Sequence, residues 1–195
     1  GEMTLLYPMW IPGDHSPTGV IEQFGGLSVQ SGGKKIAWKR DSVNVAAFHI
    51  PVSSATPTLD LHFQLLSPVT PAQGRVVMTP SIVNVEWDQV ALYPAGYFTR
   101  DINVKPSVHV PHGWQIGSAL RAGTYGDETH FNDVPFNTLV DSPIYAGRYF
   151  RKWQLNAPGQ TPVSLEVVAD DPDSLNATPA QIEAHSNLVH QAVAV

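Results

Sequence analysis

Short runs in which apolar and polar residues alternate dominate this chain. The clearest run is Leu-Asp-Leu-His-Phe-Gln-Leu at residues 59–65. In a strand every second side chain lies on the same face. A run that alternates in this way therefore predicts a half-buried β-strand. The same alternation at 102–110 and 163–167 predicts two further strands. Pro106 lies inside the first of these and predicts an edge position or a bulge, because proline lacks the N–H that a central strand needs.

Shorter segments rich in apolar residues predict the remaining strands. Turn-forming clusters separate them, such as Ser31-Gly32-Gly33 and Pro111-His112-Gly113. No segment between them shows a helical period. About ten short strands joined by turns predict a mainly β fold, in which antiparallel sheets form a β-sandwich-like domain. The shorter strand segments are 4–7, 35–39, 43–50, 75–78, 82–87, 89–93, 129–131 and 145–155.

The pattern changes after Ala169. A polar stretch at 170–173 precedes Thr178-Pro179-Ala180-Gln181, in which the Thr and Gln side chains can form a reciprocal helix cap. Proline at the first helical position supports the same start. The remaining residues contain no helix breaker, so we expect a C-terminal α-helix. We therefore divide the chain into a β-rich domain at 1–170 and a linker with one helix at 171–195.

Both ends of the chain lie within predicted elements. Gly1-Glu2-Met3 leads directly into a strand-like segment, without the pattern of a signal peptide. The helical pattern reaches Val195 without a cap. We therefore expect the natural chain to begin earlier and to continue into a further domain.

Composition restricts the partners. Of the 195 residues, 43% are hydrophobic, which is enough for a core, and 14% are charged. The formal net charge of −6 and the lack of long Lys/Arg clusters argue against nucleic acid and an anionic membrane as partners. No apolar run approaches the ~20 residues of a membrane span. Without cysteine the chain has no disulfide and no thiolate metal site, and it fits an exported bacterial protein as well as a cytosolic one.

Motifs that would supply a complete catalytic centre are absent. The chain has no His-Glu-x-x-His zinc motif, no Gly-x-Ser-x-Gly elbow and no glycine-rich phosphate loop. His185 and His190 are five residues apart on the predicted helix and point in different directions, so they are poor co-ligands. Glu86 and Asp88 permit a glycosidase-like carboxylate pair, although two surface carboxylates on one strand are commoner. We therefore predict no catalytic residue and no metal site in this chain.

Aromatic residues leave a binding function open. Carbohydrate-binding β-sandwich modules stack sugars on exposed aromatic rings, and the chain has five Trp and six Tyr. Trp38, Trp87, Trp114 and Trp153 fit this role, and they fit equally well as anchors of a large core. A free-standing carbohydrate-binding module is therefore the alternative class of function.

Four segments of the chain, at 4–19, 75–80, 90–97 and 138–149, carry a resemblance to a known family. The first reads Thr-Leu-Leu-Tyr-Pro-Met-Trp-Ile-Pro-Gly-Asp-His-Ser-Pro-Thr-Gly. Together they resemble the N-terminal region of the glycyl-aminopeptidase family of zinc metallopeptidases. The resemblance implies a β-rich N-terminal domain, then a thermolysin-like zinc domain, then a PDZ domain. Because the chain stops before the zinc motif, no catalytic residue carries over, and zinc is implied for the parent protein alone.

The resemblance also implies a role for this domain. In related two-domain aminopeptidases the front β domain packs against the catalytic domain and helps to close the substrate cleft. By this analogy Asp141, Ser142, Tyr145 and Gly147 are the candidate cleft residues. Asp141 would hold the terminal ammonium of a peptide and Tyr145 would bound its first side-chain pocket; the alternative is a simple turn before a buried strand.

The function expected from the sequence is that of a non-catalytic N-terminal domain. It would act as a scaffold and shape the cleft of a zinc aminopeptidase that removes N-terminal Gly or Ala from peptides. Its partners would be the catalytic domain of the same chain and, through that domain, the peptide substrate.

Overall fold

A computed structural model describes residues 1–11, 13–56, 58–124, 128–156 and 161–193. Within these residues every pair of strands is antiparallel, and ten of the seventeen strands have four or more residues. The predicted mainly β fold with antiparallel sheets and a C-terminal helix is therefore confirmed. The strands are β1 (Glu2–Leu6), β2 (Phe24–Ser31), β3 (Lys34–Ile36), β4 (Lys39–Arg40), β5 (Ala47–Pro51), β6 (Asp60–Leu65), β7 (Ile82–Val85), β8 (Tyr93–Pro94), β9 (Asn103–Val104), β10 (Ser107–His109), β11 (Gln115–Ser118), β12 (Ala122–Thr124), β13 (Glu128–Phe131), β14 (Val134–Pro135), β15 (Ile144–Gly147), β16 (Tyr149–Gln154) and β17 (Ser164–Ala169). The helices are α1 (Phe136–Val140), α2 (Pro179–Val193) and the short 3-10 helices η1 (Ile21–Gln23), η2 (Pro71–Gln73), η3 (Trp87–Gln89), η4 (Thr99–Asp101) and η5 (Pro172–Leu175).

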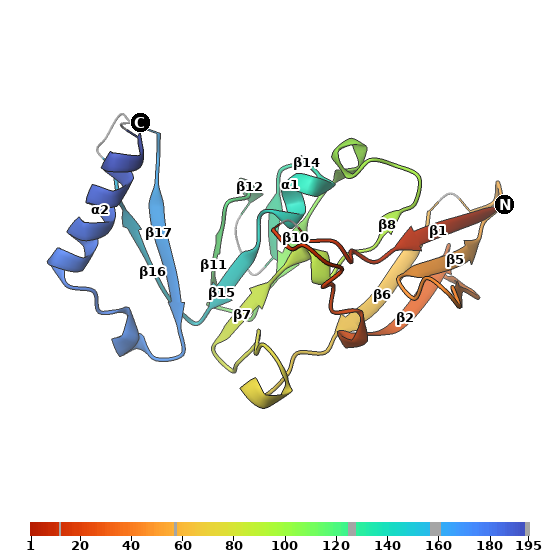
Figure 1. Ribbon diagram of the computed structural model, residues 1–195, viewed down its shortest axis with the longest axis horizontal. Helices are drawn as coiled ribbons and strands as arrows, with labels where there is room; N and C mark the ends of the chain where they lie inside the picture. The colour runs from red at the N-terminus through yellow and green to blue at the C-terminus, as the bar shows by residue number, and fades with distance from the viewer. Residues whose placement is uncertain (12, 57, 125–127, 157–160, 194–195) are drawn as a thin grey trace.

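Two sheets at the N-terminal end face each other across a core (Figure 1). One has the strand order β4-β5-β1-β8 and the other β3-β2-β6. Leu5 and Ile50 from the first sheet and Val29 from the second are buried in one cluster, which is how two half-buried sheets remove their apolar faces from water. We call this pair of sheets the N-terminal sandwich.

Local sequence explains the strands of this sandwich. In β6 the residues alternate between exposed and half-buried, as the run at 59–65 predicts. The β2–β3 hairpin turns at Gly32 and Gly33, whose φ angles are +54° and +76°. Two consecutive positive φ angles match the tight hairpin turns that follow the strand twist, and glycine reaches them without steric strain. The predicted turn at Ser31-Gly32-Gly33 is confirmed.

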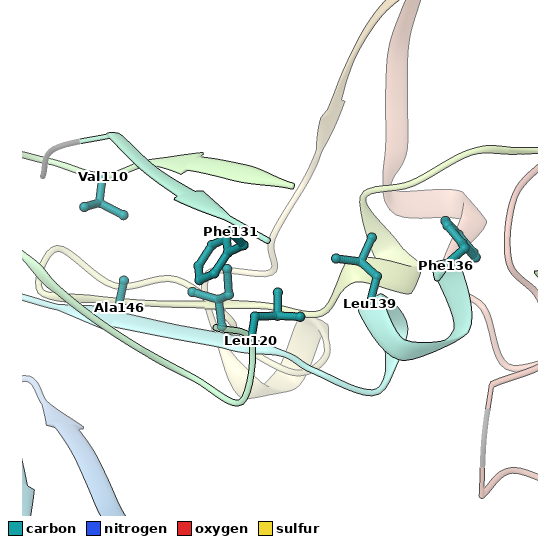
Figure 2. Packing of buried hydrophobic residues seen from close by; sticks show 7 residues of the cluster. Val110, Leu120, Phe131, Phe136, Leu139 and Ala146 are labelled. Atoms are coloured by element: carbon teal, nitrogen blue, oxygen red, sulfur yellow. The ribbon is translucent and has the colours of Figure 1, made fainter. Parts of the chain in front are cut away.

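A second apolar cluster, the central core, lies between the sheet β11-β15-β7, the sheet β10-β13-β12 and α1. Figure 2 shows Leu120 and Phe131 close to Ala146 of β15, with Leu139 and Phe136 carried by α1. These side chains come from segments far apart in the chain, so the core joins them into one unit. The buried residues of the central core are Val110, Leu120, Phe131, Phe136, Leu139, Ile144 and Ala146.

Several predicted strands differ from the structure. The segment at 102–110 is interrupted at Lys105-Pro106 and forms the two short strands β9 and β10, as the proline suggested. The segment at 75–78 forms only an isolated bridge between Met78 and Val83. The segment at 89–93 is mostly non-strand, because η3 precedes it and β8 begins only at Tyr93.

The C-terminal part consists of the β16–β17 hairpin and α2, at the opposite end of the molecule from β1 (Figure 1). Helix α2 begins with the predicted reciprocal cap. The Gln181 N–H donates to Oγ1 of Thr178 at 3.3 Å, and the Thr178 N–H donates to Oε1 of Gln181 at 2.8 Å. The cap satisfies two N–H groups that the first helical turn leaves unpaired. None of the described helices combines the length and apolar character that crossing a membrane requires.

Candidate functional site

A pocket of about 350 Å³ lies where the N-terminal sandwich meets the central core. Its walls come from the end of β1 and the loop after it, from η3, β8 and η4, and from α1. The volume lies at the small end of the range that is usual for ligand pockets, about 300–1,000 Å³. We call it the junction pocket. Its main apolar walls are Tyr7, Met9, Trp10, Tyr93, Phe136 and Val140.

Three of the four segments that carry the family resemblance meet at this pocket. The segment at 4–19 contributes the residues from Leu6 to Trp10, the segment at 90–97 contributes Tyr93, and the segment at 138–149 contributes Val140 and Asp141. The segments are separated by tens of residues in the chain. Only the tertiary structure brings them together, and it does so around a concavity that also contains two carboxylates.

Asp88 is the buried carboxylate of the junction pocket. Its side chain is 6% exposed, and its Oδ2 has no hydrogen-bond partner among the described residues. Burial raises the pKa of Asp88 above its usual value, and the negative charges of Glu86 and Asp14 raise it further. Tyr7 lies close by and donates its hydroxyl hydrogen to the carbonyl of Gln89 at 3.2 Å.

Glu86 does not share a site with Asp88. It forms an ion pair with Arg75 at 2.5 Å and accepts a hydrogen bond from Gln89 at 2.7 Å. The sequence placed both carboxylates on one strand face, whereas in the structure Asp88 lies in η3, beyond the end of β7. The change from strand to 3-10 helix turns Asp88 inward, so the surface-pair interpretation is wrong for this residue.

Asp141 lies at the exposed rim of the junction pocket, directly after the last residue of α1. Its backbone N–H donates to the carbonyl of Asn137 at 3.3 Å and so continues the helical turn. No partner of its carboxylate is found in the described part of the chain. An exposed carboxylate at a pocket rim is free to accept hydrogen bonds from a ligand.

Ser142 uses its polar groups within the fold. It is 6% exposed, and its hydroxyl group donates to the carbonyl of Thr138 at 2.8 Å. Its own carbonyl accepts a hydrogen bond of 3.0 Å from the indole Nε1 of Trp87. These contacts hold the turn between α1 and β15 in place, and therefore hold the backbone beside Asp141.

Tyr145 and Gly147 lie on the face of β15 that is turned away from the central core. Ile144 and Ala146 alternate with them and are fully buried in that core. Tyr145 is 44% exposed and lines a different pocket, of about 420 Å³, beneath the β16–β17 hairpin. A Cβ at Gly147 would lie 3.1 Å from Val168, which shows how closely β17 packs there.

The structure therefore divides the four candidate cleft residues between two places. Asp141 belongs to the junction pocket and Tyr145 to the pocket beneath the hairpin. Ser142 and Gly147 are buried beside them. A direct contact of any of them with substrate stays a prediction.

The described residues do not fit a zinc ion. No group of three or more His, Cys, Asp or Glu side chains among them is arranged to hold a metal. On α2, His185 directs its Nδ1 to the carbonyl of Gln181 at 2.8 Å. A structural or catalytic zinc site needs at least three protein ligands that converge.

The tryptophans separate into core and surface residues. Trp38 packs against the N-terminal sandwich, and Trp87 and Trp114 pack against the central core, as the core interpretation predicts. Trp10 was not among the candidates for stacking, yet it is 69% exposed at the junction pocket. Its position next to a proline-rich loop was the available signal.

The described residues form a β-rich domain with antiparallel sheets and two pockets of several hundred Å³. The family model described as the Peptidase M61 N-terminal domain matches residues 1–148, so the chain belongs to this family. The resemblance noted from the four segments is thereby confirmed. The match ends immediately before β16, so β16, β17 and α2 lie beyond it.

A solved structure has the same fold. The chain is similar to the crystal structure of an aminopeptidase N family protein from Idiomarina loihiensis, with a TM-score of 0.66 and 16% sequence identity. The similarity covers 85% of this chain and 27% of that chain, so this chain spans about a quarter of its relative's length. No curated protein matches the sequence.

Proposed function

We propose that this chain is the non-catalytic N-terminal domain of a zinc aminopeptidase that removes N-terminal Gly or Ala from peptides. It acts as a scaffold for the catalytic domain of the same chain and forms part of the substrate cleft. The observation that carries this proposal is the junction pocket, where three of the four family-like segments meet and Asp141 stands at the rim. The zinc would be held by the catalytic domain, because the described residues here provide no ligand set.

Asp141 is the residue through which this domain would contact the peptide. Its carboxylate can accept charge-assisted hydrogen bonds from a terminal ammonium, which are stronger than neutral ones. Ser142 supports this role by anchoring the same turn to Thr138 and Trp87. Tyr145, in the pocket beneath the hairpin, would bound the space for the first side chain, and Gly147 allows β17 to pack beside it.

Steady-state kinetics on the peptidase that carries this domain tests the proposal. Asp141→Asn keeps the size of the side chain and removes its charge. We expect KM for peptides with a free N-terminus to rise about tenfold with a smaller change in kcat, because a charge-assisted contact is lost on binding. Asp60→Asn, on the exposed face of β6, is the matched control and should leave both constants unchanged. Kinetics of Asp141→Asn identical to the parent would contradict the role of this residue.

Carbohydrate binding is the second candidate, and exposed aromatic rings favour it. Trp10, Tyr97 and Phe98 are 69%, 66% and 67% exposed. Such rings can stack on sugar faces. A glycan array with the purified chain, repeated with Trp10→Ala, distinguishes the two functions. Glycan binding that needs Trp10, together with no effect of the domain on peptide cleavage, would replace the peptidase proposal.

A further inference from the structure

The junction pocket contains an acid of which one carboxyl oxygen has no hydrogen-bond partner among the described residues. Asp88 is 6% exposed, yet its Oδ2 finds no donor among the described residues. A buried carboxyl oxygen without a hydrogen bond is unfavourable, and such groups are uncommon in folded proteins. Asp88 is also one of the residues that line the pocket.

The charge of the pocket selects a cation. Asp88 and Asp141 both line it, and its described lining contains no Lys, Arg or His. Beyond the wall, Asp14 and Glu86 lie close enough to act on Asp88, and both are acidic. Glu86 is paired with Arg75. The carboxylates of the lining, Asp88 and Asp141, are therefore the ones that would attract a cation and repel an anionic ligand.

The walls of the pocket select an organic cation. Tyr7, Trp10, Tyr93 and Phe136 surround it with aromatic rings, and the rings of Tyr93 and Phe136 lie 5.3 Å apart. Aromatic faces attract ammonium groups and also cover apolar carbon. A Ca²⁺ or Mg²⁺ ion needs about six oxygen ligands instead, and the described residues contain no group of three or more side chains arranged to hold a metal.

The exposed fractions of the lining residues distinguish the floor of the pocket from its mouth. Tyr7 and Phe136 are 1% and 4% exposed and form the floor together with Asp88. Trp10 is 69% exposed and Asp141 lies at the rim. A ligand with a charged end and an apolar body can therefore place its charge at Asp88 and keep its body between the rings.

We propose that the junction pocket binds a protonated organic amine with an apolar or aromatic body, and that Asp88 is the buried carboxylate that receives its ammonium group. This site does not rest on the proposed function, because the pocket is complete within this chain. A domain that took no part in peptide cleavage would still bind the amine.

Calorimetric titration of the purified chain tests the site with phenethylammonium as the probe and 2-phenylethanol as its uncharged counterpart. We expect phenethylammonium to bind, and 2-phenylethanol to bind at least about tenfold more weakly, because it cannot form the charge-assisted contact. Asp88→Asn should weaken phenethylammonium binding by at least about tenfold and leave the binding of 2-phenylethanol unchanged.

Two further variants keep the test decisive. Glu166→Gln removes one carboxylate from the other pocket and should bind the amine like the parent. Trp10→Ala changes an exposed side chain, so it should fold normally and still weaken binding through the lost aromatic wall. No binding of the amine, equal binding of amine and alcohol, or full binding of the amine by Asp88→Asn would overturn the proposal. If Asp88→Asn does not fold, the preference of the parent for phenethylammonium over 2-phenylethanol decides, together with Trp10→Ala.

Two sources of such an amine can be told apart in the same assay. Phe-Gly carries its ammonium at a peptide N-terminus, and N-acetyl-Phe-Gly lacks it. Binding of Phe-Gly but not of the acetylated form identifies a peptide terminus as an acceptable source. Binding of phenethylammonium alone identifies free amines as the ligands, and either result supports the site.

Discussion

The indole Nε1 of Trp87 donates a hydrogen bond of 3.0 Å to the backbone carbonyl of Ser142. Trp87 opens η3, which carries Asp88, and Ser142 follows Asp141 in the turn after α1. The bond therefore ties together the two segments that bring carboxylates to the junction pocket. Although 55 positions separate the two residues in the chain, their contact joins the segment at the floor of the pocket to the segment at its rim.

Trp87→Phe should destabilise the domain. The ring remains large enough to pack in the central core, but the Ser142 carbonyl loses its donor in a partly buried position. A lost hydrogen bond of this kind costs about 1–3 kcal/mol. We expect urea unfolding to show a lower midpoint with an unchanged slope. Trp10→Phe, at an exposed position, is the control and should unfold like the parent.

Asp88→Asn should make the domain more stable at neutral pH. Burial raises the folded-state pKa of Asp88 above 3.8, so the folded protein holds this proton more tightly than the unfolded chain. The domain therefore loses stability as the pH rises from the pKa of Asp88 in the unfolded chain through its raised pKa in the folded protein. Asparagine carries no charge, so the variant avoids this loss.

Urea unfolding of both proteins between about pH 4 and pH 7 checks this expectation. The stability difference should be largest at neutral pH and shrink toward the acid end. A difference that is independent of pH would mean that Asp88 does not titrate in this range.

His49→Gln should remove a pH-dependent contribution to stability from β5 of the N-terminal sandwich. His49 lies between Asp41 and Glu2, with 2.9 Å from Nε2 to the Asp41 carboxylate and 2.9 Å from Nδ1 to the Glu2 carboxylate. The hydrogen bond with Asp41 raises the pKa of His49 above 6.5. The same bond, with help from the N–H groups of Asn44 and Val43, lowers the pKa of Asp41 to about 2.

The two shifts define a pH window. The contribution of His49 to stability is complete below pH 6.5, and it is lost as the pH rises through the raised pKa of His49 in the folded protein. The contribution of Asp41 to stability is complete above pH 3.8, and it is lost as the pH falls through the lowered pKa of Asp41, about 2. The cost of His49→Gln should thus be greatest between these limits and decline at alkaline pH, in urea midpoints measured across the range. His62→Gln, on the exposed face of β6, should show no such profile.

Gly147→Ala should loosen the hairpin from the sheet beneath it. A Cβ at this position would lie 3.1 Å from the Ser81 carbonyl and 3.1 Å from Val168, and one of these neighbours must move. Overpacking of this kind costs about 1–3 kcal/mol. Gly123→Ala is the matched control, because its Cβ would meet its first neighbour at 3.5 Å. Equal melting temperatures of the two variants would contradict the close packing of β17 on β15.

The elements that were predicted correctly depend on residues close together in the chain. The alternation in β6, the glycine turn between β2 and β3 and the reciprocal cap of α2 each involve neighbours within a few positions. Helix α1 was not predicted, because its five residues are too few to show a helical period. Its position is determined by the packing of Phe136 and Leu139 in the central core.

The candidate site was found only in part. Asp141 was singled out by the family resemblance and does lie at a pocket, whereas Tyr145 lies at another. Asp88 was interpreted as a surface carboxylate, since its neighbours predicted a strand. Whether a carboxylate is buried depends on what packs over it, and η3, which carries Asp88, is in contact with α1 from a distant part of the chain.

By itself the sequence determined the mainly β class, the turns, the capped C-terminal helix and the relation to the peptidase family. These features follow from local properties of the chain: the periodicity of its side chains, the backbone preferences of its residues, and short segments that resemble a family in the same order. The tertiary structure alone decided that three distant segments enclose one pocket and that Asp88 is buried with one carboxyl oxygen unpaired among the described residues. It also decided that Trp87, next to Asp88, is tied to the turn at Ser142. These features arise from long-range packing, which places residues together irrespective of their separation in the sequence.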